Sequence, residues 1–212
     1  VSPGGIHSNS DCSNGIQVSG SAVIETDSFT TVAPGANIVG GTVNPMPTFN
    51  VPPVTDPYAG VYSPPTTNPF GTCAGWQQVS PSDGDLDLYP GCYGGLGISG
   101  DNHTITMHGP GVFFFNGNVG VNGSNNVLQV TGDSGDGSIV VLTQGLGLYS
   151  DNNDILFNNT LVVVTGGSFE FAGNGSVDYS HTPPASGTYA GLSLWSTSGA
   201  HIGIHGNSGS VV

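Results

Sequence analysis

The 212-residue chain carries 14 aspartates and glutamates but no lysine or arginine, so its formal net charge at pH 7 is −14. Binding to nucleic acid or to an anionic membrane surface is excluded, because both need cationic side chains near phosphate groups. A P-loop nucleotide site is excluded as well, since its lysine is missing.

Apolar residues recur in short clusters, and only 7% of the residues are charged, so we expect a folded chain rather than a disordered one. The longest apolar runs, such as 112–115 and 161–164, are too short for a membrane-spanning helix, and no signal peptide is recognisable. Helical periodicity is missing, whereas short strand-like stretches bounded by glycine, asparagine and aspartate are frequent. We therefore expect an all-β protein.

The first half of the chain contains a weak strand repeat at Val18–Val23 and then a proline-rich segment at 44–69. Eight prolines in those 26 residues forbid a helix and interrupt any β-ladder. We expect this segment to be an extended excursion that packs over a single domain of residues 1–212.

The second half of the chain contains two interleaved strand series. Four segments run apolar, any residue, small, polar, asparagine, and then return to alternating apolar residues: 98–107, 121–130, 148–157 and 171–179, the last of which is one residue shorter. A second series of strands lies between and after them: 112–115, 139–142, 161–164 and 192–195. A weaker copy of the first pattern follows at Ile204–Ser208.

Two strand series that share one drifting period predict coils that stack so that like strands pair in parallel. The predicted fold is a β-solenoid, a right-handed parallel β-helix with coils of about 23–27 residues, its hand following the general preference of parallel connections. Ile98, Val121, Leu148 and Phe171 then occupy adjacent coils. A β-sandwich is the alternative fold, but it would give alternating hairpins without the recurrent turn.

The turn in each repeat places an asparagine at one corner. Asn102, Asn125 and Asn152 tolerate a left-handed backbone, and stacked at the spacing of neighbouring strands their amides are expected to bond in a ladder. The alternate residues of the second series are expected to fill the interior: Phe113, Phe115, Val140, Leu142, Val162 and Val164.

Metal and cofactor sites are not expected. The acidic stretch Asp83–Asp87 resembles the start of a calcium loop, but the residues that follow do not supply the later ligands, so we favour a solvated acidic turn. Asp151–Asp154 falls on a predicted corner. His201 and His205 lie on one strand face but too far apart to share an ion.

Catalysis is not expected either. Lyases that act on uronates need a basic residue, which the chain lacks, and a glycosidase needs two carboxylates across a cleft. The candidate pairs Asp133–Asp136 and Asp151–Asp154 lie in turns. The Thr104–Thr106 pattern, which an ice-binding array would repeat in each coil, does not recur.

The three cysteines match no zinc pattern. Cys73 and Cys92 flank an acidic loop, and Pro90-Gly91 turns the chain back before the second cysteine, so we predict a Cys73–Cys92 disulfide with Cys12 reduced and packed. The rival pairing, Cys12–Cys73, would leave Cys92 free.

Several motifs spread over nearly the whole chain carry a resemblance to a known family. In chain order they are Gly5-Ile-His-Ser-Asn-Ser-Asp-Cys12, Asp56-Pro-Tyr-Ala-Gly60, Cys73, Leu88-Tyr-Pro-Gly-Cys-Tyr-Gly-Gly95, Ile98-Ser-Gly100, Pro110-Gly-Val-Phe-Phe-Phe115 and Tyr189-Ala-Gly-Leu192 with Trp195. This order resembles the secreted C-terminal region of TadG-like proteins, which are bacterial proteins associated with Flp (Tad) pilus assembly. The resemblance implies an extracytoplasmic, non-catalytic role at the pilus or envelope, and it favours the Cys73–Cys92 pairing.

The sequence therefore predicts a non-catalytic structural or adhesive protein, extracellular or at a bacterial cell surface, without cofactor. Its expected partners are further copies of itself or pilus and envelope components. The alternative function is a carbohydrate-binding or carbohydrate-processing module. Its glycan would stack on exposed aromatics, for which Trp76, Tyr89 and Tyr93 are the candidates, although core packing is the competing role for each.

Overall fold

The computed structural model confirms the all-β fold class. It describes residues 5–8, 11, 13, 16–20, 23–25, 27–55, 60–132, 135–148, 152–173, 177–197, 201–206 and 210–211. In these residues every regular element is a β-strand, and the paired strands run parallel, as stacked coils require. No helix in this part of the chain is long and apolar enough to cross a membrane.

The structure divides into two compact units, and the single domain expected for residues 1–212 stays a prediction. Unit 1 comprises Val1–Val61 with His205–Ser208, and unit 2 comprises Tyr62–Ile204 with Gly209–Val212. The boundary after Val61 lies inside the proline-rich segment. Both units are built from the same kind of short parallel strand, so composition alone does not separate them.

Unit 1 is a short stack of coils. Its strands are β1 (Gly5–Ser8), β2 (Gln17–Ser19), β3 (Val23–Glu25), β4 (Ser28–Thr31), β5 (Asn37–Val39) and β6 (Thr42–Asn44). They pair in parallel as β1–β4, β2–β5 and β3–β6. Thr48 bridges Thr30, and Val51 N–H donates to the Thr31 carbonyl at 3.2 Å, so the first part of the proline-rich segment begins a further coil.

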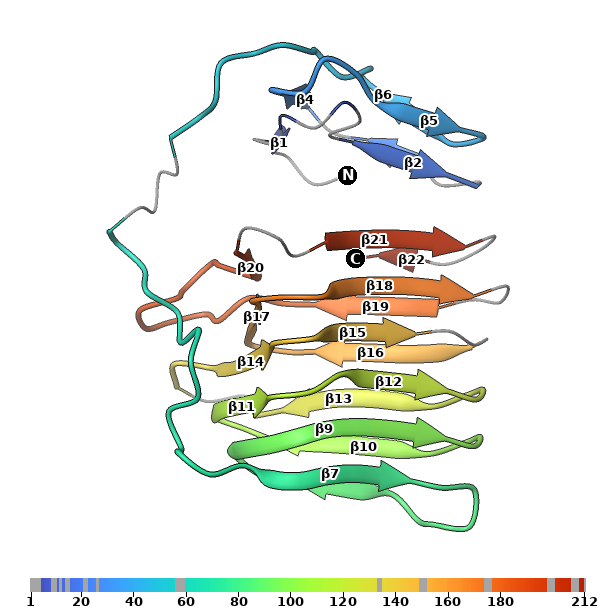
Figure 1. Ribbon diagram of the computed structural model, residues 1–212, viewed down its shortest axis with the longest axis vertical. Coiled ribbons are helices and arrows are strands. Elements are labelled where there is room, and N and C mark those ends of the chain that lie inside the picture. Colours follow the sequence, from blue (N-terminus) through green and yellow to red (C-terminus); the bar gives the residue numbers. More distant parts are fainter. Residues whose placement is uncertain are drawn as a thin grey trace. The chain divides into compact units, whose positions relative to one another are not determined.

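Unit 2 contains a six-stranded parallel sheet in the order β22–β19–β16–β13–β10–β8. These strands are β8 (Leu86–Leu88), β10 (Thr104–His108), β13 (Val127–Thr131), β16 (Asn153–Phe157), β19 (Val177–His181) and β22 (Ser210–Val211). One strand of this sheet belongs to each successive coil, and Figure 1 shows the coils stacked from green to orange.

The second, larger sheet of the chain is centred on the long strand β9 (Gly91–Ser99). On one flank lie β11 (Gly111–Phe115), β14 (Ser138–Leu142), β17 (Thr160–Val164) and β20 (Leu194–Ser196). On the other lie β12 (Val119–Asn122), β15 (Gly145–Leu148), β18 (Ser168–Gly173) and β21 (His201–Gly206). Strand β7 (Ala74–Val79) pairs with β9 alone.

The register confirms the predicted repeat. Ile98 pairs with Val121, Val121 with Leu148 and Leu148 with Phe171, at intervals of 23, 27 and 23 residues. Because of these intervals, each coil places an apolar residue directly beside the equivalent residue of the neighbouring coil, and core packing then fixes the register.

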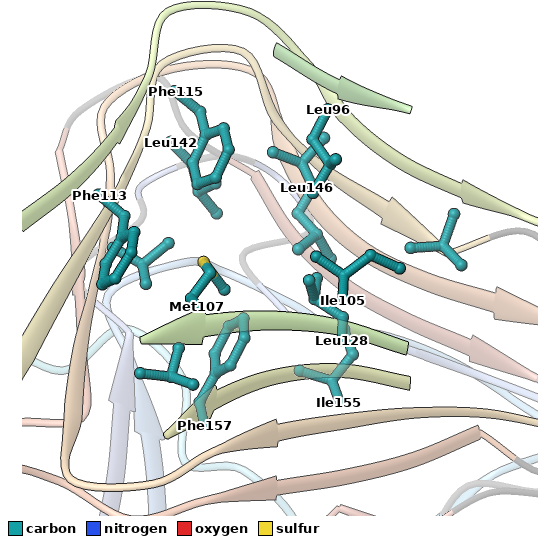
Figure 2. Packing of buried hydrophobic residues seen from close by; sticks show 14 of the residues in the cluster. Leu96, Ile105, Met107, Phe113, Phe115, Leu128, Leu142, Leu146, Ile155 and Phe157 are labelled. Carbon is teal, nitrogen blue, oxygen red and sulfur yellow. The ribbon is translucent and has the colours of Figure 1, made fainter. Parts of the chain in front are cut away.

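The interior of unit 2 is a continuous apolar core (Figure 2). The six residues predicted to fill it are all buried: Phe113, Phe115, Val140, Leu142, Val162 and Val164. They meet Ile105, Leu128 and Ile155 from the six-stranded sheet. Close packing along the stack holds each coil on its neighbours.

The outer face of strands β11, β14 and β17 is also apolar and buried, which the sequence pattern did not predict. Phe114, Val141 and Val163 are each no more than 2% exposed and form a second cluster. Tyr189 and Leu192, from the segment after β19, pack against this cluster. The continuous apolar runs of these strands therefore reflect burial on both faces.

Candidate functional site

The corner asparagines have the backbone that the repeat predicts. Asn102, Asn125 and Asn152 have φ values of 66°, 59° and 56°, in the left-handed region. The Asn125 side-chain amide donates to Oδ1 of Asn102 at 3.3 Å. The corner turns each coil, and its outer side chains at 102 and 125 are exposed.

A second, buried ladder lies one residue further along the same corner. Asn126 N–H donates to Oδ1 of Asn153 at 2.9 Å, and His103 N–H donates to Oδ1 of Asn126 at 2.9 Å. The two amide groups donate in turn to the carbonyls of Gly100 and Gly123, each at 2.9 Å. The asparagine doublets 125–126 and 152–153 are the signal that could have revealed this ladder.

Cys73 and Cys92 form a disulfide, with 19 residues of sequence separation and Cα atoms 4.5 Å apart. Both cysteines pack with the outer apolar cluster, and the bond ties the start of β7 to β9. Cys12, the third cysteine, lies outside the described residues.

Trp76 lies in β7 on the outside of the stack, with 52% of its surface exposed. The ring covers three glycines: a Cβ built on Gly95 would lie 2.2 Å from Cζ3, one on Gly97 3.2 Å from Nε1, and one on Gly117 3.4 Å from Cζ3. One face of the indole therefore rests on the backbone of the neighbouring strands, where no side chain intervenes.

Hydrogen bonds hold the edge of this ring. Trp76 Nε1–H donates to Oε1 of Gln78 at 3.3 Å. The Gln78 amide donates to Oγ of Ser99 at 3.1 Å and to the Val79 carbonyl at 3.2 Å. The Ser99 hydroxyl donates to that same carbonyl at 3.2 Å, so the indole orientation is tied to two strands.

The other two candidate aromatics do not join Trp76 in one platform. Tyr93 stacks on buried Phe115, with ring centroids 5.5 Å apart, and packs against the core. Its hydroxyl bonds the backbone N–H and carbonyl of Tyr89. Tyr89 is exposed and stacks on His108 at 5.1 Å. The structure thus gives Trp76 and Tyr89 separate surroundings and assigns Tyr93 to packing.

The acidic loop 83–87 uses its carboxylates within the fold. The bonds are Ser80 N–H to Asp83 Oδ2, Thr104 N–H to Asp85 Oδ1 and His108 Nε2 to Asp87 Oδ1, each 2.7 Å long. In the part of the chain that the structure describes, no group of three or more histidine, cysteine, aspartate or glutamate residues could hold a metal ion. Thr106 faces Gln129 in the next coil, so the threonine pattern stops there.

The remaining carboxylate and histidine candidates are only partly described. Asp133 and Asp151 lie outside the described residues, and the side chains of His201 and His205 are not described. Asp136 is exposed and borders a pocket of about 230 Å³ on the outer face of β11 and β14. The lining residues are Gly111, Val112, Asp136, Gly137, Ile139, Thr188 and Tyr189, with a single carboxylate among them. Among the described residues the lining therefore supplies one carboxylate, whereas a glycosidase uses two.

A histidine and a tyrosine form a short chain of hydrogen bonds at the end of β19. His181 Nε2 donates to the Thr160 carbonyl at 2.7 Å, so Nδ1 accepts from the Tyr179 hydroxyl at 2.6 Å. Burial lowers the pKa of His181, partly offset by the bond to Thr160, and burial raises the pKa of Tyr179. Both groups are therefore neutral at pH 7 and contribute to packing.

Comparison with known proteins found no match. The sequence matches no family model and no curated protein, and no solved structure is similar to the chain.

Proposed function

We propose that the protein is a non-catalytic structural or adhesive β-solenoid displayed outside the cell, at a bacterial surface, pilus or envelope. The observation that supports this most is that the polar side chains best placed for chemistry form hydrogen bonds with the backbone of the stacked coils. Asn126 and Asn153 bond backbone at a corner, and Asp83 and Asp85 accept from backbone amides.

Three features support the location. A disulfide is typical of proteins that mature in an oxidising compartment. A chain without lysine or arginine offers trypsin no cleavage site, which suits exposure to proteases. The motif order from Gly5 to Trp195 resembles the secreted region of TadG-like proteins. The partners that fit are further copies of the chain or other pilus and envelope components.

The proposal is tested by locating the protein on cells and by assaying the purified protein for polysaccharide cleavage. Immunogold labelling of intact cells should mark the surface, and negative-stain images of the purified protein should show whether it forms filaments or single particles. Incubation with neutral glucans and with polygalacturonate should release neither reducing ends nor unsaturated products. Label confined to the cytosol, or steady product release by pure protein, would contradict the proposal.

The second candidate function is carbohydrate binding without catalysis. The specific observation that favours it is the exposed indole of Trp76, whose ring is held at its edge and on one face. Aromatic rings of this kind give large, rigid contact area at low entropic cost.

A further inference from the structure

We propose that Trp76 and Gln78 form a binding subsite for a neutral, gluco-configured pyranose of a glucan. This inference rests on the second candidate function, carbohydrate binding, and names its ligand class. It is independent of the structural role, because a protein without glycan affinity would still perform that role. It rests on the geometry of the Trp76 ring, its hydrogen bonds and the charge of the chain.

The ring geometry provides one free face. The underside of the indole occupies the space that side chains at Gly95 and Gly97 would fill, and half of the tryptophan surface remains exposed. The negative face of an aromatic ring attracts positively polarised edges, which the axial C–H groups of a gluco-configured pyranose provide across a flat apolar face.

The edge of the ring provides oriented polar atoms. Gln78 and Ser99 lie beside the indole on the same outer surface of β7 and β9, and their mutual bonds fix both side chains. Their oxygens retain lone pairs that can accept from equatorial hydroxyl groups at the sugar rim. Because these groups are already ordered, little side-chain entropy is lost on binding.

The charge of the chain selects the ligand. With a formal charge of −14 and no cationic side chain, the protein repels uronates and sulfated sugars and offers them no counter-ion. A neutral glucan carries no such penalty. The chemistry therefore fits a glucan and excludes a pectate-like chain.

A structural role for the same ring makes a different prediction. An aromatic side chain laid over glycines of a neighbouring strand shields and stabilises the sheet without any ligand. In that case Trp76→Leu, which retains apolar cover over Gly95 and Gly97, would affect stability alone.

The experiment measures binding of cellohexaose to the full chain by acrylamide quenching of tryptophan fluorescence, in a Trp195→Phe background that leaves Trp76 as the single reporter. Sugar is expected to protect the indole from quenching, and polygalacturonate at the same sugar concentration is not. Trp76→Leu and Trp76→Ala, measured by calorimetry, should each lower affinity at least tenfold, which corresponds to about 1.4 kcal/mol.

Tyr89→Ala is the matched control, because Tyr89 is exposed to a similar degree but stacks on His108. It should leave the affinity unchanged. Absence of protection by cellohexaose, equal binding by folded Trp76→Leu, or stronger binding of polygalacturonate would each overturn the proposal. Self-association that buries Trp76 and disappears in Trp76→Leu would overturn it as well, because the occupant would then be a second copy.

Discussion

Asn126 and Asn153 occupy the same buried corner of successive coils, and the backbone N–H of one donates to the side chain of the other at 2.9 Å. Both are no more than 1% exposed. Each amide also donates to a carbonyl of the preceding coil, so every rung joins neighbouring coils by side chain and by backbone. Strand pairing and corner bonding are therefore coupled in this stack.

Asn126→Ala should destabilise the fold by about 2–3 kcal/mol, because it leaves the His103 N–H and the Gly100 carbonyl without their side-chain partner in a buried place. Urea unfolding measures the change. Asn125→Gly is the matched control: its side chain is exposed and its φ is 59°, which glycine adopts easily. Similar losses in the two variants would mean that the buried ladder contributes little.

His103→Asn should stabilise the protein by about 1 kcal/mol by adding a rung. His103 is buried, and in the described structure its Nε2 has no hydrogen-bond partner. Pro81 lies beside Gly100, since a Cβ built on Gly100 would be 2.9 Å from the Pro81 Cα. An asparagine at position 103 is therefore expected to reach the Pro81 carbonyl as Asn126 reaches that of Gly100. A lower unfolding midpoint than wild type would show that the first corner cannot accept the rung.

The sequence predicted the coil length and the outer corner because both depend on local features. Period and alternation fix which residues face inward, and asparagine marks a left-handed corner at 102, 125 and 152. The buried ladder was not predicted. The residue after each corner asparagine can point inward or outward, and which it does depends on the bend of the neighbouring coil. The burial of Val141 and Val163 on the outer face of their strands was not predicted, because the segment that covers them is distant in sequence.

The three aromatics considered for glycan stacking also show what the sequence could not predict. Trp76, Tyr89 and Tyr93 are close in sequence, yet β7 and β9 place them in different surroundings. The glycines beneath Trp76 are visible in the sequence, but only the β7–β9 register, which pairs Trp76 with Gly95, shows that they lie under the ring.

Replacing both Cys73 and Cys92 by serine should cost about 3 kcal/mol, because opening a loop of this length restores conformational entropy to the unfolded chain. Chemical unfolding of the oxidised wild type and the double variant gives the difference. Non-reducing peptide mapping with pepsin should find the 73–92 cross-link, and Cys12→Ser should leave both results unchanged. A cross-linked peptide that contains Cys12 would contradict this pairing.

The stability of the protein should fall as the pH drops from about 7 to 5, in part through His181. Burial lowers the pKa of His181 in the folded chain below the unfolded value of about 6.5, so the unfolded chain binds the proton more readily. The contribution of neutral His181 to the free energy of unfolding is therefore fully present above the pKa of the unfolded chain. It is lost as the pH falls towards the lower pKa of the folded chain. The rings of Phe157 and Tyr179 and the Thr160 carbonyl surround the imidazole.

His181→Gln removes this titration and should flatten the dependence of the melting temperature on pH between 7 and 5. The glutamine amide can still donate towards Thr160, so the packing change is small. Tyr179→Phe is the companion variant: it removes the hydroxyl that donates to Nδ1 but retains the buried histidine, so it should lower stability and keep most of the slope. An unchanged slope in His181→Gln would assign the acid sensitivity to other groups.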